Sequence, residues 1–318
     1  MSTNPIPTRI LGVGELLWDL LPTPPGKQLG GAVANFCYFA RTLGGTAAKV
    51  TLASAVGRDI LGRELLARLA QLRLNPDNIQ QDDRHPTGTV TVKVDAHGQP
   101  TYTIHHPVAW DFIKCTPALL TLAGQADALC FGTLAQRSDF SRQTIRKLLQ
   151  ATRPDAIRVF DINLRQSFHT PEIIKESLEL ANVLKLNDEE LPLLARALEL
   201  PAPAAGDAAA ETAFFKQLSQ RHNLKLIALT RGNRGSTLWS YTGPAVETST
   251  IPAETVAVVD SVGAGDAFTA ALVVGLLAAR PLAVIHRQAS RLAAYVCTQA
   301  GATPPFTPAL LDSLSRPE

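Results

Sequence analysis

Short β-favouring apolar runs alternate along this chain with longer segments whose apolar residues recur at helical spacing. This alternation predicts an α/β fold, a doubly wound and mostly parallel sheet with helices on both faces. In such sheets ligands bind beyond the carboxyl ends of the strands. The expected strands are Arg9–Gly14, Lys49–Val56, Asp127–Phe131, Ile157–Asp161, Val183–Leu186 and Leu224–Leu229. The expected helices are residues 32–44, 59–73, 138–152, 171–180, 188–199, 208–221, 264–279 and 281–299.

One stretch breaks this rhythm. Residues 87–111 alternate apolar and polar side chains around a turn signal at Asp95–Gly98, which predicts a β-hairpin with one exposed face. The hairpin is either an edge decoration or an active-site lid.

Residues 201–210 are rich in Ala and Pro and predict a surface loop, because strand–helix alternation continues beyond them. We therefore expect one domain spanning residues 1–318.

The net charge of the chain and the lengths of its apolar runs exclude several kinds of partner. A net charge of +2 predicts neither a nucleic-acid surface nor an acidic partner. No run approaches about 20 apolar residues, so no membrane span is expected. The apolar run from Ile10 to Leu21 contains Glu15 and Asp19 and lacks a basic leader, so it is not read as a signal peptide. We expect a cytoplasmic protein.

The cysteines and the densest basic cluster predict structural roles. The four cysteines form no Cys-x-x-Cys pair and lie in apolar stretches, so we expect buried free thiols in a reducing compartment. The basic cluster is expected to form the solvated face of a helix. Its members are Arg137, Arg142, Arg146 and Lys147.

Residues 264–279 are apolar on every helical face apart from Asp266 and one threonine, so they predict a buried helix. Gly263, Ala264 and Gly265 have almost no side chain, so the first N–H groups of this helix are open to an anion. A carboxylate one residue later is placed to accept a proton from a nucleophile that attacks the anion. The alternative is that Asp266 is simply a favourable acid in a first turn.

Two polar residues interrupt apolar stretches near the start of the chain. Asn35 follows Gly30 and Gly31 at the head of an expected helix, where a buried carboxamide needs partners. A substrate hydroxyl or neighbouring backbone would satisfy it. Asp19, which follows Trp18, either accepts two vicinal sugar hydroxyls or is a surface acid in a turn.

Two further motifs follow expected strands. Asn187 and Glu190 are three residues apart, so they share a helical face and could offer oxygen atoms to a hydrated Mg2+. The same spacing is that of a capping box. Thr230 ends a strand before a turn that contains Gly232 and Gly235. Such a turn accepts the phosphates or ribose of a nucleotide, or is an ordinary β-turn.

The order of these motifs is more informative than any one of them. GGAVAN near the start and DSVGAGD near the end resemble the two signatures of the PfkB, or ribokinase-like, carbohydrate kinases. Between them, DINLR, KLNDEE and TRGNRG fall in the order of that family, and the resemblance runs from about Ile10 to Phe306. GELLWDLLP, HPTGTV and GTLAQR resemble fructokinases most closely.

The resemblance implies a ribokinase-like fold and ATP-dependent phosphorylation of a free sugar, with fructose the first choice. It makes Asp266 the general base and the backbone of Gly263, Ala264 and Gly265 the anion hole for the transferring γ-phosphoryl group. The more usual threonine of the second signature is Ser261 here, which leaves the role intact. The residues that the resemblance assigns to the sugar are Asp19, Gly30, Gly31, Asn35 and Arg165, the last touching either substrate or phosphate.

The resemblance also implies a nucleotide side, a lid and ions. Mg2+ is expected near Glu190 through water, and many members bind K+ through carbonyls near Asp260 and residues 300–303. Residues 15–30 and 87–111 correspond to the family's lid, which often pairs two subunits into a homodimer. The residues assigned to ATP are Asn187, Glu190, Thr230, Gly232 and Gly235.

Other functions remain open at this point. A dinucleotide-binding fingerprint fails, because Leu17 stands where the third glycine after Gly12-Val13-Gly14 is required. The Walker A loop and the protein-kinase motifs are absent from the sequence. The alternatives that remain are a 2-keto-3-deoxygluconate kinase or ribokinase, a nucleoside or vitamin kinase, and a non-catalytic sugar-binding regulator.

Overall fold

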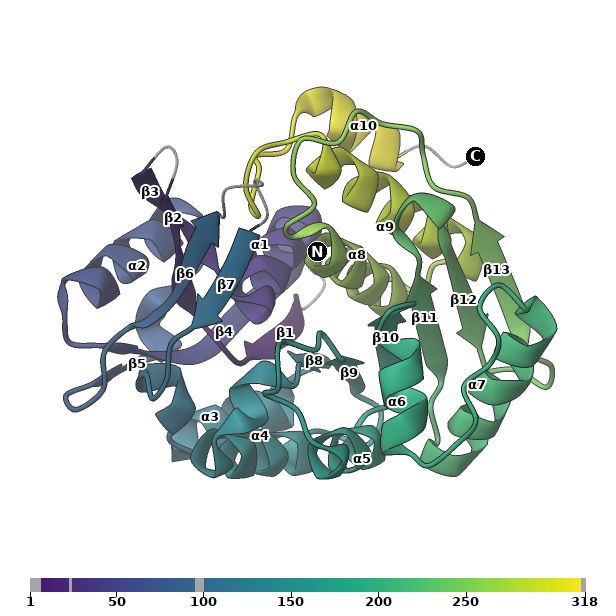
Figure 1. The fold of residues 1–318 in the computed structure, drawn as a ribbon, viewed down its shortest axis with the longest axis horizontal. Helices are drawn as coiled ribbons and strands as arrows, with labels where there is room; N and C mark the ends of the chain where they lie inside the picture. The colour runs from purple at the N-terminus through teal and green to yellow at the C-terminus, as the bar shows by residue number, and fades with distance from the viewer. Residues whose placement is uncertain (1–6, 23–24, 95–99, 316–318) are drawn as a thin grey trace, which may run out of the picture.

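The computed structural model describes residues 7–22, 25–94 and 100–315. Its main feature is a nine-stranded sheet in the order β13-β12-β11-β10-β9-β8-β1-β4-β5 (Figure 1). All neighbouring strands from β11 through β5 in that order run parallel, and β12 is antiparallel to both of its neighbours. The strands are β1 (Thr8–Val13), β4 (Ala48–Gly57), β5 (Ile79–Asp82), β8 (Ala128–Phe131), β9 (Ile157–Asp161), β10 (Val183–Asn187), β11 (Leu226–Thr230), β12 (Ser236–Ser240) and β13 (Glu247–Ile251).

The six strands expected from the sequence are all present, each within about two residues of its expected ends. Their side chains are buried on both faces, as the near-continuous apolar runs require of a covered parallel sheet. The expected α/β, mostly parallel architecture is confirmed. Of the other three strands, β12 follows the glycine-bearing turn after Thr230. The short strands β5 and β13 were not expected, because IQQD and ETSTI carry few apolar residues and lie at the two edges of the sheet.

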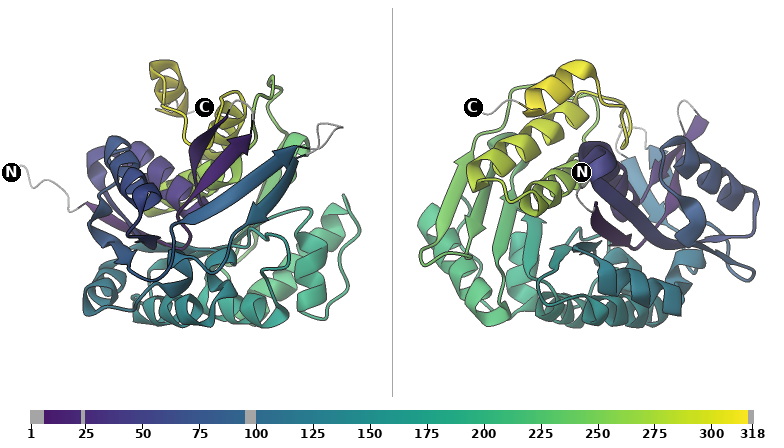
Figure 2. Two further views of the ribbon diagram at one scale, coloured as in Figure 1. Left: turned by 60° about the vertical axis from the view of Figure 1, so that its left-hand side comes forward. Right: turned by 180° about the vertical axis from the view of Figure 1, so that it is seen from behind.

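Helices cover both faces of the large sheet (Figures 1 and 2). One hydrophobic core lies between the sheet and α3 to α7, and the other lies between the sheet and α1, α8 and α9. Helix α8 packs between α1 and α9, which explains why it is apolar on nearly every face. The helices are α1 (Ala32–Gly44), α2 (Ile60–Gln71), α3 (Pro117–Gln125), α4 (Asp139–Ala151), α5 (Pro171–Leu180), α6 (Leu191–Ala197), α7 (Ala208–His222), α8 (Ala264–Leu277), α9 (Leu282–Cys297) and α10 (Pro308–Ser315).

The eight expected helices are present, and α3 and α10 are additional. Both additional helices are short, and each begins with a proline after a threonine. In α3 the Thr116 hydroxyl accepts a hydrogen bond from the Leu119 N–H, so a single capping residue starts a helix that is too short for a clear apolar period. Residues 201–207 form the loop that was expected before α7.

A second, smaller sheet stands beside the large one, in the order β3-β2-β6-β7. Its strands β6 (Gly88–Val94) and β7 (Pro100–Ile104) are antiparallel, which confirms the expected hairpin, and the turn at Asp95–Gly98 lies outside the described residues. Strand β2 (Leu17–Pro22) pairs in parallel with β6 and antiparallel with β3 (Pro25–Gly30). Both β2 and β3 are therefore inserted between β1 and α1.

The basic cluster differs from its expectation at Arg137. The Arg137 guanidinium is buried, and it donates to both carboxylate oxygens of Asp111 at 2.8 and 2.9 Å. It also lies 3.9 Å from the ring centre of Trp110 and 4.7 Å from that of Phe168. An arginine can be buried in this way because the carboxylate compensates its positive charge and the aromatic rings make cation–π contacts with its planar guanidinium group. Of the rest of the cluster, Lys147 is exposed and the two arginines are half-buried beside Glu176.

The cysteines follow their expectation in part. All four are free, but only Cys37 and Cys130 are buried, while Cys115 and Cys297 are half-buried. Among the residues that the structure describes, no helix is long and apolar enough to cross a membrane.

Candidate active site

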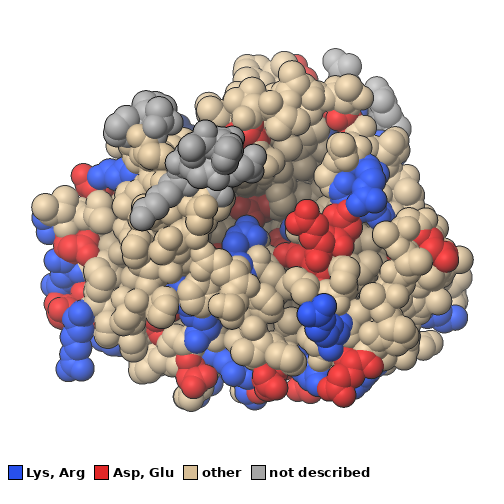
Figure 3. Space-filling model, in the orientation of Figure 1, with Lys and Arg blue, Asp and Glu red and all other residues tan. Residues whose placement is uncertain are grey.

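Polar side chains gather at the carboxyl ends of the parallel strands, where this class of sheet binds its ligands. Asp161 ends β9, Asn187 ends β10 and Thr230 ends β11, while Asp266 lies in the first turn of α8. The molecular face seen in Figure 1 is hollowed near its centre, and acidic and basic side chains border the hollow (Figure 3).

Asp266 and Asn35 meet across the gap between α8 and α1. The Asn35 carboxamide Nδ2 donates a hydrogen bond of 2.9 Å to Asp266 Oδ2. Both readings of Asn35 from the sequence are therefore incomplete, because its amide group binds another side chain. Its carbonyl oxygen Oδ1 is buried and has no protein partner among the described residues.

The surroundings of Asp266 raise its pKa to about 6. Loss of hydration is the largest cause and the charge of Asp161 adds to it, while the bond from Asn35 and the cations of Lys185 and Arg165 act in the opposite direction. Asp266 as a whole residue is half-buried. It is therefore mostly ionised at neutral pH and has a pKa suited to accepting a proton there.

Backbone geometry explains the glycines before Asp266. Gly263 has φ 84°, and a Cβ at this position would collide with the carbonyl oxygen of Ala302. Gly265 has an ordinary φ, but a Cβ there would lie 3.0 Å from the Lys185 ammonium nitrogen. The N–H groups of this first turn, from Gly263 to Asp266, have no acceptor within the helix, and the Ala264 N–H donates to the Ser261 carbonyl oxygen at 3.3 Å. The turn thus forms a positive helix end of the kind that binds anions.

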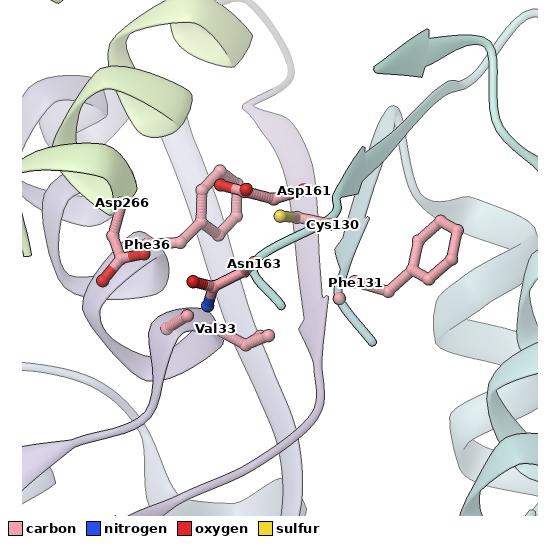
Figure 4. A pocket seen from close by; sticks show the side chains of 9 residues that line it. Val33, Phe36, Cys130, Phe131, Asp161, Asn163 and Asp266 are labelled. Carbon is pink, nitrogen blue, oxygen red and sulfur yellow. The ribbon is translucent and has the colours of Figure 1, made fainter. Parts of the chain in front are cut away.

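A small pocket opens beside Asp266. In Figure 4, Asp266 from α8 and Asn163 from the loop after β9 point toward the same space, whereas the Phe131 ring points away from it. Asn163 has φ 43°, a left-handed conformation that is uncommon for a residue with a side chain. The residues that line the pocket are Ala32, Val33, Phe36, Cys130, Phe131, Gly132, Asp161, Asn163 and Asp266.

The small sheet contributes Asp19, from β2. Burial raises the pKa of this carboxyl group to about 6, with the charge of Arg165 opposing the shift and that of Asp260 adding to it. A Cβ at Gly30 would collide with the Asp19 carboxylate, and one at Gly31, where φ is 108°, would collide with the Glu15 carbonyl oxygen. Gly31 is therefore required by its backbone conformation and by the Glu15 backbone, whereas Gly30 leaves room for the Asp19 and Leu17 side chains.

Glu15 is a site residue that sequence reasoning missed. It is buried where the chain leaves β1 for the small sheet, and its Oε1 accepts a hydrogen bond of 3.1 Å from the Ala32 N–H, at the start of α1. Burial raises its pKa to about 7, helped by the charge of Asp266 and opposed by that of Arg165. The signal in the sequence was an acid inside an apolar run.

A buried charge network under α8 was also missed. Lys185 Nζ lies 3.1 Å from Asp161 Oδ1, and the Thr269 hydroxyl donates to Asp161 Oδ2 at 2.8 Å. All three side chains are buried. A lysine in the middle of an apolar strand, two residues before Asn187, was the available signal, but its partner is visible only once β9 and β10 are paired.

Arg165 is exposed, and its guanidinium donates to the Leu164 carbonyl oxygen at 3.1 Å. Its charge nevertheless acts on the pKa of Glu15, Asp19 and Asp266. It therefore lies where the acids of the small sheet and of α8 converge.

Further along the same sheet edge, Asn187 and Glu190 form the capping arrangement. The Asn187 N–H donates to Glu190 Oε2 and the Glu190 N–H donates to Asn187 Oδ1, both at 2.8 Å. The other oxygen, Glu190 Oε1, accepts from the Leu164 N–H at 2.8 Å. The described residues contain no group of three or more His, Cys, Asp or Glu that could hold a metal ion. Both oxygens of the Glu190 carboxylate are thus already hydrogen-bonded to backbone N–H groups.

The turn after β11 is a short 3-10 helix, Gly232–Arg234. Gly232 has φ 54° and Gly235 has φ 85°, and a Cβ at Gly235 would collide with the Ile251 carbonyl oxygen. Thr230 is half-buried at the head of this turn. The expected nucleotide residues therefore adjoin one another across β10 and β11, which pair through Asn187 and Thr230.

Fold and candidate site together are those of an α/β protein whose polar side chains gather at the carboxyl ends of a parallel sheet, beside a smaller second sheet. The chain matches the pfkB family of carbohydrate kinases over residues 22–310. It is 32% identical to a fructokinase of Salmonella typhimurium over 276 residues, which cover 84% of this chain and 83% of that protein. This protein belongs to the pfkB carbohydrate kinase family.

Solved structures agree with this assignment. The crystal structure of a sugar kinase from Pyrococcus horikoshii superposes with a TM-score of 0.79 at 27% identity, covering 96% of this chain and 97% of that one. The same kinase in complex with ATP gives a TM-score of 0.72 at 26% identity, covering 92% and 94%. The ribokinase-like fold is thereby confirmed, and the protein is an ATP-dependent sugar kinase.

Proposed function

We propose that this kinase transfers the γ-phosphoryl group of ATP to a hydroxyl group of free fructose, with Asp266 as the general base. The observation that carries the proposal is the position of the Asp266 carboxylate at a small pocket, next to the first turn of α8, whose N–H groups have no acceptor within the helix. Fructose is favoured because the relatives at 32% and 31% identity, from Salmonella typhimurium and Klebsiella pneumoniae, are named fructokinases. 2-Keto-3-deoxygluconate, ribose and nucleosides are the alternative acceptors.

In the proposed reaction the sugar hydroxyl gives its proton to Asp266 as its oxygen attacks the γ-phosphorus, and the bond to the ADP oxygen breaks. Asn35 holds Asp266 Oδ2, so the other oxygen is the one that takes the proton. The N–H groups of Gly263, Ala264 and Gly265 stabilise the charge on the transferring group as an anion hole. Phosphoryl transfer needs mainly positioning and charge stabilisation, and this arrangement supplies both.

The sugar is proposed to lie between the small sheet and α8. Asp19 would accept its hydroxyl groups, Gly30 and Gly31 would let it approach the backbone, and Arg165 would contact the sugar or a phosphate. The Asn35 Oδ1 is buried and has no protein partner among the described residues, so a sugar hydroxyl that reached it would satisfy it. Segments 15–30 and 87–111 would then act as a lid within one domain of residues 1–318, and pairing of two lids would give a homodimer.

The nucleotide is proposed to lie along the ends of β10 and β11, beside Asn187, Glu190, Thr230, Gly232 and Gly235. Mg2+, when bound with ATP, would neutralise phosphate charge. Because Glu190 already accepts two backbone N–H groups, it would order the water molecules around the ion.

A K+ ion is proposed beside the anion hole, where residues 260–263 and 300–303 meet. Both Asp260 oxygens accept backbone N–H groups, from Val262 at 2.9 Å and Gly301 at 3.1 Å. The Asp260 side chain therefore fastens the two segments together, and backbone carbonyl groups would be the ligands. Replacing K+ by Na+ in the assay should lower the rate, and an equal rate would remove this ion from the proposal.

A coupled ADP-release assay across fructose, 2-keto-3-deoxygluconate, ribose and a set of nucleosides tests the substrate. We expect the highest kcat/KM with fructose, and in Asp266→Asn a rate of release lowered by about 10²- to 10⁴-fold under the same conditions. A higher kcat/KM with another acceptor would replace fructose. No sugar-dependent release from any member of the panel would contradict the acceptor class.

A further inference from the structure

Lys185 is a charged group enclosed by protein. Its side chain is 7% exposed, and lysines are almost never buried unless they are paired. Burial acts to lower its pKa, but the carboxylates of Asp161, Glu190 and Asp266 outweigh this and raise the pKa above its ordinary value. The side chain is therefore a fixed ammonium ion inside the protein.

The partner of this ammonium ion connects it to the helix that carries Asp266. Asp161 uses one oxygen for Lys185 and the other for the hydroxyl of Thr269, which lies one turn into α8. The Thr269 hydroxyl is also 3.0 Å from the carbonyl oxygen of Gly265. Through these contacts the ends of β9 and β10 are fastened to the first turn of α8.

The ammonium ion also lies directly against that turn. A Cβ at Gly265 would be 3.0 Å from Lys185 Nζ, closer than side chains normally approach, although the φ of Gly265 is ordinary. Because Gly265 has no side chain, the Lys185 ammonium group can lie next to the N–H groups that are proposed to bind the anion. No other described feature of the backbone requires glycine here.

The charge balance around Asp266 depends on this lysine. Without it, Asp161 and Asp266 would be two neighbouring carboxylates in a poorly hydrated site, which raises the pKa of one of them strongly. Lys185 and Arg165 act against that rise. The titratable groups that face Asp266 are Glu15, Cys130, Asp161, Arg165 and Lys185.

We propose that Lys185 is a positioning residue for phosphoryl transfer, which with Asp161 and Thr269 fixes the first turn of α8 and holds Asp266 ionised beneath the anion site. The proposal rests on the assignment of Asp266 as the general base. It adds to that assignment a set of residues that lie behind the first turn of α8 and act on the reacting atoms only through Gly265 and Asp266.

The test is the pH dependence of kcat/KM for the sugar in Lys185→Met, Asp161→Asn and the double variant. Removing a nearby charge moves a pKa by roughly one unit, and the direction follows its sign. The acid limb of the profile should therefore move to higher pH in Lys185→Met and to lower pH in Asp161→Asn. The double variant, which leaves no unpaired charge buried, should have a limb between the two.

At pH 7 we expect kcat to fall by about 10- to 100-fold in Lys185→Met, the usual effect of losing a group that supports a catalytic residue, with smaller changes in both KM values. Thr269→Val, which keeps every charge, is the control and should leave the acid limb in place. Equal acid limbs in the wild type, Lys185→Met and Asp161→Asn would overturn the proposal, even if the melting temperatures differ. Activity retained in Asp266→Asn would instead remove the general base itself, so the two failures are distinguishable.

Discussion

Asn35 and Asp266 are 231 residues apart in sequence and are joined by one hydrogen bond of 2.9 Å. The bond links the first turn of α1 to the first turn of α8, so the orientation of the proposed base is set before substrate binds. It also fixes which carboxylate oxygen is occupied. An acid held in this way is ready for proton transfer without rearrangement, which is the form of preorganisation that electrostatic catalysis needs.

Asp266→Asn should abolish most activity while the protein stays folded. The amide keeps the size of the side chain but cannot accept the hydroxyl proton, and general-base assistance is typically worth about 10²- to 10⁴-fold in rate. We expect kcat to fall by that order, with binding of ATP and sugar retained in titration calorimetry. The melting temperature should hold or rise slightly, because a poorly hydrated carboxylate is removed. Turnover near the wild-type rate would take Asp266 out of the mechanism.

Asp19→Ala should weaken sugar binding far more than ATP binding. A hydrogen bond to a charged group contributes about 1.5–3 kcal/mol, so the KM for sugar should rise by roughly 10- to 100-fold. Asp83→Ala is the matched control, because Asp83 is an acid whose side chain is 75% exposed and pairs with Arg58. Equal weakening of sugar and ATP binding in Asp19→Ala would give Asp19 a structural role.

Gly263→Ala should disrupt the anion hole. A side chain at φ 84° is strained by itself, and this Cβ would in addition collide with the Ala302 carbonyl oxygen. Gly206→Ala isolates the first effect, because Gly206 has φ 79° and no atom within 4 Å of an added Cβ. The control should cost about 1–2 kcal/mol of unfolding free energy and leave kcat unchanged. Gly263→Ala should cost more and lower kcat. Matching losses in both variants would show that the contact with Ala302 contributes nothing.

Glu15→Gln should flatten the dependence of stability on pH. The pKa of Glu15 is raised from its ordinary 4.5 to about 7 in the folded protein, so in this window the folded state binds a proton that the unfolded chain releases. Stability therefore falls as pH rises through the window, by roughly 3 kcal/mol for a shift of this size. Glutamine keeps the acceptor for the Ala32 N–H without a charge.

Denaturant unfolding between pH 5 and 8 measures this slope. The exposed Glu189→Gln should retain the wild-type slope, whereas Glu15→Gln should lose part of it. An unchanged slope in Glu15→Gln would mean that Glu15 does not change its protonation on unfolding.

Local pattern was sufficient for the large sheet and for most helices. Ile157–Asp161 and Pro171–Leu180 have the lengths that their apolar runs predict, because burial on a covered sheet and a threonine cap before Pro171 act within a few residues. Strand β13 was not predicted, since its stability comes from pairing with β12 at the sheet edge and not from its own side chains.

In the candidate site, too, the features set by a local motif could be predicted and those set by remote contacts could not. Asp266 and the glycines before it belong to one short motif, so their place at the start of a buried helix could be predicted. The partner of Asn35 could not be, because it lies at the other end of the chain. Lys185 and Asp161 come together only through the pairing of β9 with β10, and Arg137 was placed on a solvated face because Trp110 and Asp111 are remote in sequence.

The insertion of β2 and β3 between β1 and α1 places the residue proposed to bind the sugar and the residue that orients the proposed base on one continuous stretch of chain. Asp19 lies in β2, and the stretch returns through Gly31 to the turn of α1 that carries Asn35. Glu15 joins the point at which this stretch leaves β1 to the point at which it enters α1, through its bond to the Ala32 N–H. A sugar that draws Asp19 inward would therefore pull on the same backbone that sets the hydrogen bond to Asp266. Occupancy of the sugar site and readiness of the base would then be mechanically coupled, with no second subunit involved.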